Sequence, residues 1–158
     1  MNSLWAVVPA AGSGRRLGGE IPKQYREIAG APLLEHTLRA LLGSADVRGV
    51  VVALDPSDRR ADAIASLSDV RVQTVPGGAE RAHSVLAGLE HLAPQAGDDD
   101  WVLVHDAARP CLSLDALSAL IAEARSLNEG VILASPVADT LKQVNVDGAV
   151  TATIDRST

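Results

Sequence analysis

Short, mainly apolar runs that alternate with helical patterns constrain the fold of this chain more than any other feature. The runs lie at residues 4–8, 50–54, 70–75, 101–104 and 131–134. Each has the length of a β-strand, and a strand that is apolar at successive positions is buried on both faces. Strands of this kind are typical of a parallel sheet that is covered by helices.

The segments between these runs have helical spacing. Four helices are predicted, at residues 32–42, 57–67, 79–92 and 113–127. Ser57 and Ser113 are suited to cap the second and fourth of these, and Val85, Leu86, Leu89 and Leu92 define an apolar face on the third. The predicted fold class is therefore α/β, with a Rossmann-like, doubly wound, mostly parallel sheet in a single domain over residues 1–158.

Composition excludes several classes of protein. The net charge of −6 argues against general nucleic-acid binding, which depends on a cationic surface. No run approaches the eighteen apolar residues that a membrane span needs, and no signal peptide is expected at the N-terminus. The single cysteine, Cys111, excludes an internal disulfide and suits the reducing cytoplasm.

The stretch at residues 9–23, P-A-A-G-S-G-R-R-L-G-G-E-I-P-K, directly follows the first predicted strand. Glycines let the backbone come close to a ligand, and successive N–H groups in such a turn can form an anion-binding nest. Arg15, Arg16 and Lys23 add three cations, which makes a polyphosphate the natural ligand. The alternative is a basic turn on the surface.

Two familiar phosphate-binding motifs do not fit this stretch. A Walker A loop needs a Gly-Lys pair, which occurs nowhere in the chain. The dinucleotide fingerprint G-x-G-x-x-G fits at Gly12 and Gly14, but Leu17 occupies the third glycine position. The loop therefore favours a nucleoside triphosphate over NAD.

Two further polar segments follow predicted strands. Ligands of open α/β sheets bind beyond the carboxyl ends of the strands, so residues 77–84 and 105–110 are expected to share a site with the first loop. In residues 77–84, G-G-A-E-R-A-H-S, the start of a predicted helix offers N–H groups to a polar ligand; the alternative is an ordinary turn and N-cap that bind none. In residues 105–110, H-D-A-A-R-P, Asp106 could bind a metal or a hydroxyl and Arg109 a phosphate, unless the two form a structural pair.

These segments together resemble one family. The motifs P-A-A-G-S-G-R-R…P-K-Q-Y, G-G-x-x-R-x-x-S-V-x-x-G and V-x-V-H-D-A-A-R-P resemble, in this order, those of the 2-C-methyl-D-erythritol 4-phosphate cytidylyltransferases of the non-mevalonate isoprenoid pathway. P-V-A-D-T at 136–140 and I-D-R at 154–156 extend the resemblance. It implies transfer of CMP from CTP to the sugar-alcohol phosphate, with release of pyrophosphate and with Mg²⁺ as cofactor. Ribitol-5-phosphate cytidylyltransferases share the nucleotide loops and are the alternative.

The resemblance also implies roles for individual residues. Arg16 and Lys23 would be catalytic. Those expected to bind the nucleotide are Ala10, Ala11, Gly12, Gly14, Gly78, Arg81, Ser84 and Asp106. Those expected to bind the acceptor are Asp106, Ala107, Arg109, Thr140 and Arg156, and Asp106 is also the candidate metal ligand. Ala79 stands where some family members have an aspartate, so a base contact from that side chain would be absent.

Residues 140–144 and 149–154 flank Asn145-Val146-Asp147-Gly148, which predicts a β-hairpin. The resemblance implies that residues 137–156 form a projecting arm that joins a homodimer and supplies Thr140 and Arg156 to the neighbouring site; the alternative is a hairpin packed on its own domain. Family members continue beyond the arm with a further segment. The alternative to an active enzyme is therefore a truncated chain that binds CTP and dimerises without turnover.

Overall fold

The computed structural model describes residues 2–12 and 21–155. A four-stranded sheet forms its centre, with strand order β5-β4-β1-β6 and every neighbouring pair parallel. The strands are β1 (Leu4–Pro9), β4 (Val47–Leu54), β5 (Val72–Pro76) and β6 (Trp101–Val104). Four of the five runs predicted to pair in a parallel sheet do so, and β1 and β4 at its centre are apolar at nearly every position and buried on both faces.

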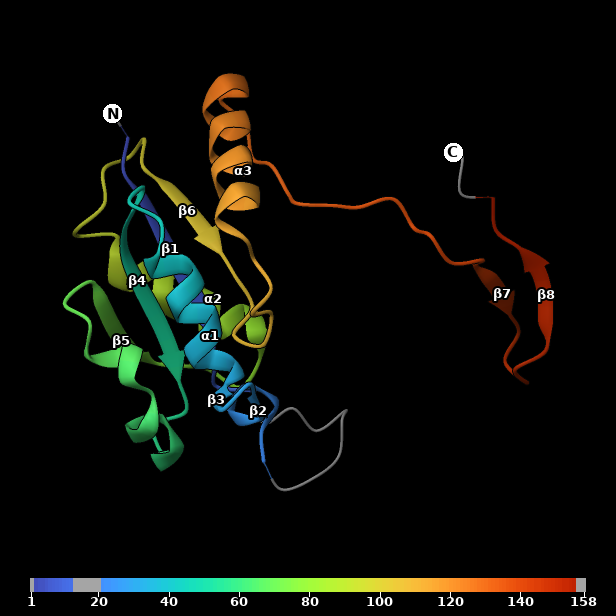
Figure 1. Ribbon diagram of the computed structural model, residues 1–158, viewed down its shortest axis with the longest axis horizontal. Coiled ribbons are helices and arrows are strands. Elements are labelled where there is room, and N and C mark those ends of the chain that lie inside the picture. Colours follow the sequence, from blue (N-terminus) through green and yellow to red (C-terminus); the bar gives the residue numbers. More distant parts are fainter. Residues whose placement is uncertain (1, 13–20, 156–158) are drawn as a thin grey trace.

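Helices cover both faces of the sheet, which confirms the doubly wound fold (Figure 1). On one face, α1 (Leu33–Leu42) and α3 (Leu114–Leu127) pack against Ala6 and Val8 of β1. On the other, α2 (Arg81–Leu92) packs against Val7. Successive residues of one strand therefore belong to two separate cores.

The buried face of α2 differs from the predicted one. Ser84, Gly88 and Leu92 are buried, whereas Leu86 and Leu89 are exposed. A Cβ at Gly88 would lie 2.5 Å from a methyl group of Val7, so the helix approaches β1 through its small residues. The prediction of an apolar face was right for Leu92 and wrong for Leu86 and Leu89, because only small residues can face β1 where the helix approaches it so closely.

The predicted helix at 57–67 is instead two short 3₁₀ helices, η3 (Arg59–Ala63) and η4 (Ala65–Ser68). Asp55 accepts hydrogen bonds from the N–H and the hydroxyl of Ser57, which holds Ser57 in a turn. Asp58 caps η3 in its place, accepting from the Arg60 N–H at 3.1 Å. Extended backbone at Ile64 then separates the two helices.

A short excursion lies between β1 and α1. It contains the 3₁₀ helix η2 (Lys23–Tyr25) and a small antiparallel pair, β2 (Glu27–Ile28) and β3 (Ala31–Pro32). Gly30 closes this pair with a φ of 78°, a conformation that favours glycine.

The chain after α3 leaves the domain. No strand forms at 131–134, because this exposed segment has no neighbouring strand to pair with in the described part of the chain. The predicted hairpin is present as β7 (Lys142–Val144) and β8 (Val150–Thr153), and it projects away from the sheet (Figure 1). Within the described residues, no helix has the length and apolar character needed to cross a membrane.

Candidate functional site

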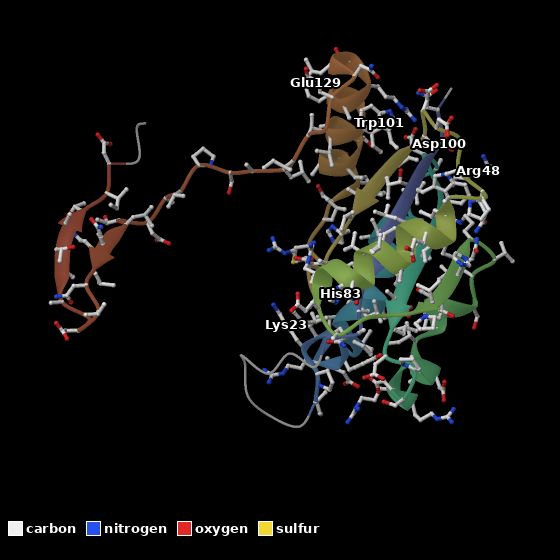
Figure 2. All side chains as sticks on the ribbon, turned by 180° about the vertical axis from the view of Figure 1, so that it is seen from behind. Lys23, Arg48, His83, Asp100, Trp101 and Glu129 are labelled. Atoms are coloured by element: carbon white, nitrogen blue, oxygen red, sulfur yellow. The ribbon has the colours of Figure 1, made fainter. Side chains whose placement is uncertain are left out.

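The three predicted loops meet at the carboxyl end of the sheet. A Cβ at Gly77, just beyond β5, would overlap the methyl group of Ala11 and lie 3.0 Å from the Ser84 hydroxyl. Lys23 and His83 lie at this end of the molecule, while Arg48, Asp100 and Trp101 lie at the opposite end (Figure 2). The loops following β1, β5 and β6 therefore share one edge, as parallel strands require.

Residues 10–12, at the start of the loop after β1, are held by hydrogen bonds to their backbone groups. The buried Ala10 donates its N–H to the Ala53 carbonyl at 2.8 Å, which extends the pairing of β1 with β4 by one residue. The carbonyls of Ala10 and Gly12 both accept from the side-chain amide of Gln24, at 2.7 and 2.9 Å. Apart from Gly12 and its chain neighbours, no atom of the described residues lies within 4 Å of the position that a Cβ at Gly12 would take.

The loop after β5 is joined to the first turn of α2. The Gly78 N–H donates to the Ser84 hydroxyl at 3.1 Å, and that hydroxyl donates back towards the Glu80 carbonyl at 3.3 Å. Two of the residues expected to bind the nucleotide thus contact each other at the start of the helix.

Asp106, just beyond β6, lies between two guanidinium groups. Arg81 contacts its Oδ1 at 2.8 Å, and Arg109 contacts its Oδ2 at 2.9 Å. Partial burial would raise the pKa of this carboxyl, but the hydrogen bond and charge of Arg81, together with Arg109, lower it below its usual value. The structure therefore brings three of the predicted site residues, from α2 and the β6 loop, into one charged cluster.

The β6 loop is held by buried polar groups. Thr37 of α1 is fully buried and donates its hydroxyl to the carbonyl of Ala107 at 3.0 Å. His105 contacts the Arg109 carbonyl through Nε2 at 2.9 Å, consistent with a structural histidine.

Gln24 and Thr37 were missed as site-supporting residues. Thr37 had a sequence signal, since it is a polar residue on the buried stripe of α1, beside Leu34, Leu38 and Leu41. Gln24 had a weaker one, as the neighbour of Lys23 in the P-K-Q-Y motif.

Not every predicted site residue joins this cluster. Lys23 is exposed at the start of η2, next to the residue that holds the β1 loop. Thr140 is exposed and lies two residues before β7, in the projecting arm. Gly14, Arg16 and Arg156 lie outside the described residues.

Comparison with known proteins agrees with the sequence motifs. Residues 4–158 match the family model described as IspD, 2-C-methyl-D-erythritol 4-phosphate cytidylyltransferase. A curated protein of that name from Pseudomonas fluorescens (strain Pf0-1) is 49% identical over 156 residues, which cover 98% of this chain and 66% of the relative. One from Aeromonas hydrophila is 53% identical over 153 residues, covering 97% of this chain and 60% of the relative.

Solved structures show the same relationship. A crystal structure of 4-diphosphocytidyl-2C-methyl-D-erythritol synthase superposes with a TM-score of 0.84 at 40% identity, covering 99% of this chain and 70% of the other. The cytidylyltransferase of Francisella tularensis gives a TM-score of 0.72 at 30% identity, covering 99% and 67%. The chain spans about two thirds of the length of the curated relatives it matches. Its match over nearly the whole sequence means that this chain belongs to the 2-C-methyl-D-erythritol 4-phosphate cytidylyltransferase family.

Proposed function

We propose that this protein transfers CMP from CTP to 2-C-methyl-D-erythritol 4-phosphate, giving 4-diphosphocytidyl-2-C-methyl-D-erythritol and pyrophosphate. The observation that carries the proposal is the junction of three loops at one sheet edge, where Arg81 and Arg109 flank Asp106 close to an open backbone turn. The names of the relatives support methylerythritol phosphate over ribitol 5-phosphate as the acceptor.

The nucleotide would lie across the β1 and β5 loops. Backbone N–H groups of the β1 loop, from Ala11, Gly12 and Gly14, would face its phosphates, and Ala10, whose own N–H is held by the Ala53 carbonyl, would line the loop beside them. Gly78, Ser84 and Arg81 would recognise the cytosine from the start of α2, and Asp106 would accept a hydrogen bond from a ribose hydroxyl. Ser84 is well placed for this because its hydroxyl already holds the Gly78 N–H and so fixes the base-recognition loop.

The acceptor would lie beside the β6 loop. Ala107 and Arg109 would contact it there, and Thr140 and Arg156 would hold its phosphate from the arm of a second subunit. Two observations support an arm that crosses to a partner: every residue of β7 and β8 is exposed, and Val144 and Val150 form an exposed apolar cross-strand pair. A lone hairpin of this kind is marginally stable in water, and packing on a second chain would stabilise it.

The chemistry would require positioning and charge more than covalent catalysis. A phosphate oxygen of the acceptor would attack the α-phosphorus of CTP as the bond from that phosphorus to the bridging oxygen breaks, and pyrophosphate would leave with the electron pair. Lys23 and Arg16 would stabilise the charge that develops on the α-phosphoryl oxygens.

Mg²⁺ would neutralise phosphate charge during this reaction. The described residues contain no group of three or more histidine, cysteine, aspartate or glutamate side chains placed to hold a metal ion. This fits an ion carried mainly by the nucleotide phosphates, with Asp106 supplying at most one protein ligand. The exposed, unpaired Cys111 is compatible with a cytoplasmic location.

Calorimetry tests the nucleotide assignment. With Mg²⁺ present, CTP should bind about tenfold or more tightly than ATP or GTP, and NAD should not bind measurably. Asp106→Asn should weaken CTP binding, because the neutral amide leaves Arg81 and Arg109 without their shared counter-ion and contacts the ribose less strongly. Asp99→Asn, in an exposed loop, is the matched control and should bind as the unaltered chain does. Equal or tighter binding of a purine nucleotide would remove the cytidylyltransferase assignment.

A further inference from the structure

The side chain of Gln24 is a buried polar group that contacts the β1 loop. It is 5% exposed, and its Nε2 donates to two carbonyls of one loop, Ala10 at 2.7 Å and Gly12 at 2.9 Å. Both partners are acceptors, so the group that faces them must be the NH₂ of the amide and not its oxygen. Its two N–H groups therefore bracket Ala11.

This bracket sets the direction of the peptide groups in the loop. A trans peptide places its C=O and N–H on opposite sides, and the described residues contain no cis peptide. The Ala10 carbonyl faces Gln24, so the N–H of Ala11, in the same peptide group, is directed away from Gln24. That is the orientation needed for an N–H that helps to form an anion-binding nest.

Two other described contacts of this segment involve different atoms. The Ala10 N–H bonds to β4 and the Ala11 methyl group packs against Gly77, but neither contact engages the carbonyls of Ala10 and Gly12. We propose that Gln24 is a positioning residue, which orients residues 10–12 of the β1 loop so that the Ala11 N–H faces the phosphates of a bound nucleotide. This inference rests on the proposed function and adds to it a residue that need not touch the nucleotide itself.

Two substitutions test the proposal in this chain. Gln24→Met keeps the length of the side chain and removes both donors, and Gln24→Glu keeps its shape and replaces the donors with acceptors. Each should weaken binding of CTP with Mg²⁺ on the order of tenfold or more, with the larger effect for glutamate, because carbonyls left facing a carboxylate would turn away. Gln95→Met, in the exposed turn that follows α2, is the matched control and should leave CTP affinity unchanged.

CTP affinity is measured well below the melting temperature of each variant. Nearly all of the protein is folded there, so losing a residue that only stabilises the fold would leave CTP affinity unchanged. If Gln24→Glu does not fold, Gln24→Met alone decides the outcome. CTP affinity of Gln24→Met within threefold of the unaltered chain would overturn the proposal.

A second measurement separates this inference from the proposed function. Hydrogen exchange of the Ala10 and Ala11 amides, followed by NMR without nucleotide, should be faster in Gln24→Met, while the amides of β4 within residues 50–52 should be unchanged. If the unaltered chain does not bind CTP, the cytidylyltransferase assignment fails, and exchange alone then tests Gln24. Unchanged exchange at both loop amides would overturn its positioning role in either case.

Discussion

At the scale of single residues, the site is made by charged and glycine residues but is held in place by buried polar ones. Gln24 holds the β1 loop, Ser84 the β5 loop and Thr37 the β6 loop, each through a hydrogen bond to backbone. The sequence predicted the chemistry-bearing residues, because glycine turns and charges at strand ends are unusual in an α/β core. It did not predict two of the three anchors, since Thr37 and Ala107 are 70 residues apart and meet only through packing.

Glu35 is a further buried anchor, which joins α1 to η4. Its carboxylate is 4% exposed and accepts from the Ser66 N–H at 3.0 Å, the Ser66 hydroxyl at 2.9 Å and Arg39 at 2.8 Å. Burial would raise the pKa of Glu35, but these hydrogen bonds, with Ser66 ahead of Arg39, lower it below its usual 4.5. The carboxylate therefore stabilises the fold at neutral pH.

Glu35→Gln should lower the free energy of unfolding by about 2 kcal/mol at pH 7, because hydrogen bonds to a charged group are lost. A carboxyl whose pKa is lowered on folding contributes its stability above the unfolded value, and that contribution is lost as the pH falls through the folded value. The difference between the two proteins should thus be constant down to about pH 5 and shrink below pH 4.5. Urea unfolding from pH 7 to pH 3 measures it, with the exposed Glu90→Gln as control. A difference that grows on acidification would contradict this account of Glu35.

At the scale of elements, the strands were more predictable than the connections between them. Burial on both faces imposes apolar residues on β1 and β4, so their sequences alone identify them. The helix predicted at 57–67 does not form because side chains there compete for backbone N–H groups. Asp55 and Asp58 each accept a hydrogen bond from the N–H two residues ahead, which favours turns over an α-helix. The run at 131–134 has strand-forming residues, but a strand also needs a partner, and no local pattern reveals that.

The arm is the element whose proposed role depends on a second chain. Val144 and Val150 are 56% and 63% exposed and face each other across β7 and β8. If this apolar pair packs on a partner, the chain should have the mass of a dimer by light scattering, and Val150→Lys should shift it towards the monomer. Thr151→Lys, at the next position of the same strand, points to the other side of the hairpin and should have a smaller effect.

Two results would contradict the arm's proposed role. One is a monomer at all concentrations for the unaltered chain. The other is a dimer that survives removal of residues 137–155.

At the scale of the whole molecule, the residues that tie the sheet together and the residues of the candidate site lie at opposite ends of the parallel strands. The amino ends of the strands are tied by Asp100, which accepts from the Ser3 N–H at 2.6 Å and the Trp5 indole at 3.1 Å. The carboxyl ends carry the glycine loops and the Arg81–Asp106–Arg109 cluster. The convergence of these loops was predictable from topology alone, and the Asp106–Arg109 pair was one alternative that the sequence left open. The Arg81–Asp106 pair depends on packing between α2 and the β6 loop and was not predicted.

Pyrophosphate release by this chain tests the central claim most directly, because it reports transfer itself. With Mg²⁺, release should require both CTP and 2-C-methyl-D-erythritol 4-phosphate, and D-ribitol 5-phosphate or ATP should not replace either. Lys23→Ala should lower turnover by roughly 10²–10³-fold, the usual cost of removing one preorganised charge donor. Release that proceeds with ribitol phosphate and not with methylerythritol phosphate, or no release with either despite bound CTP, would contradict the claim that this chain is a methylerythritol phosphate cytidylyltransferase.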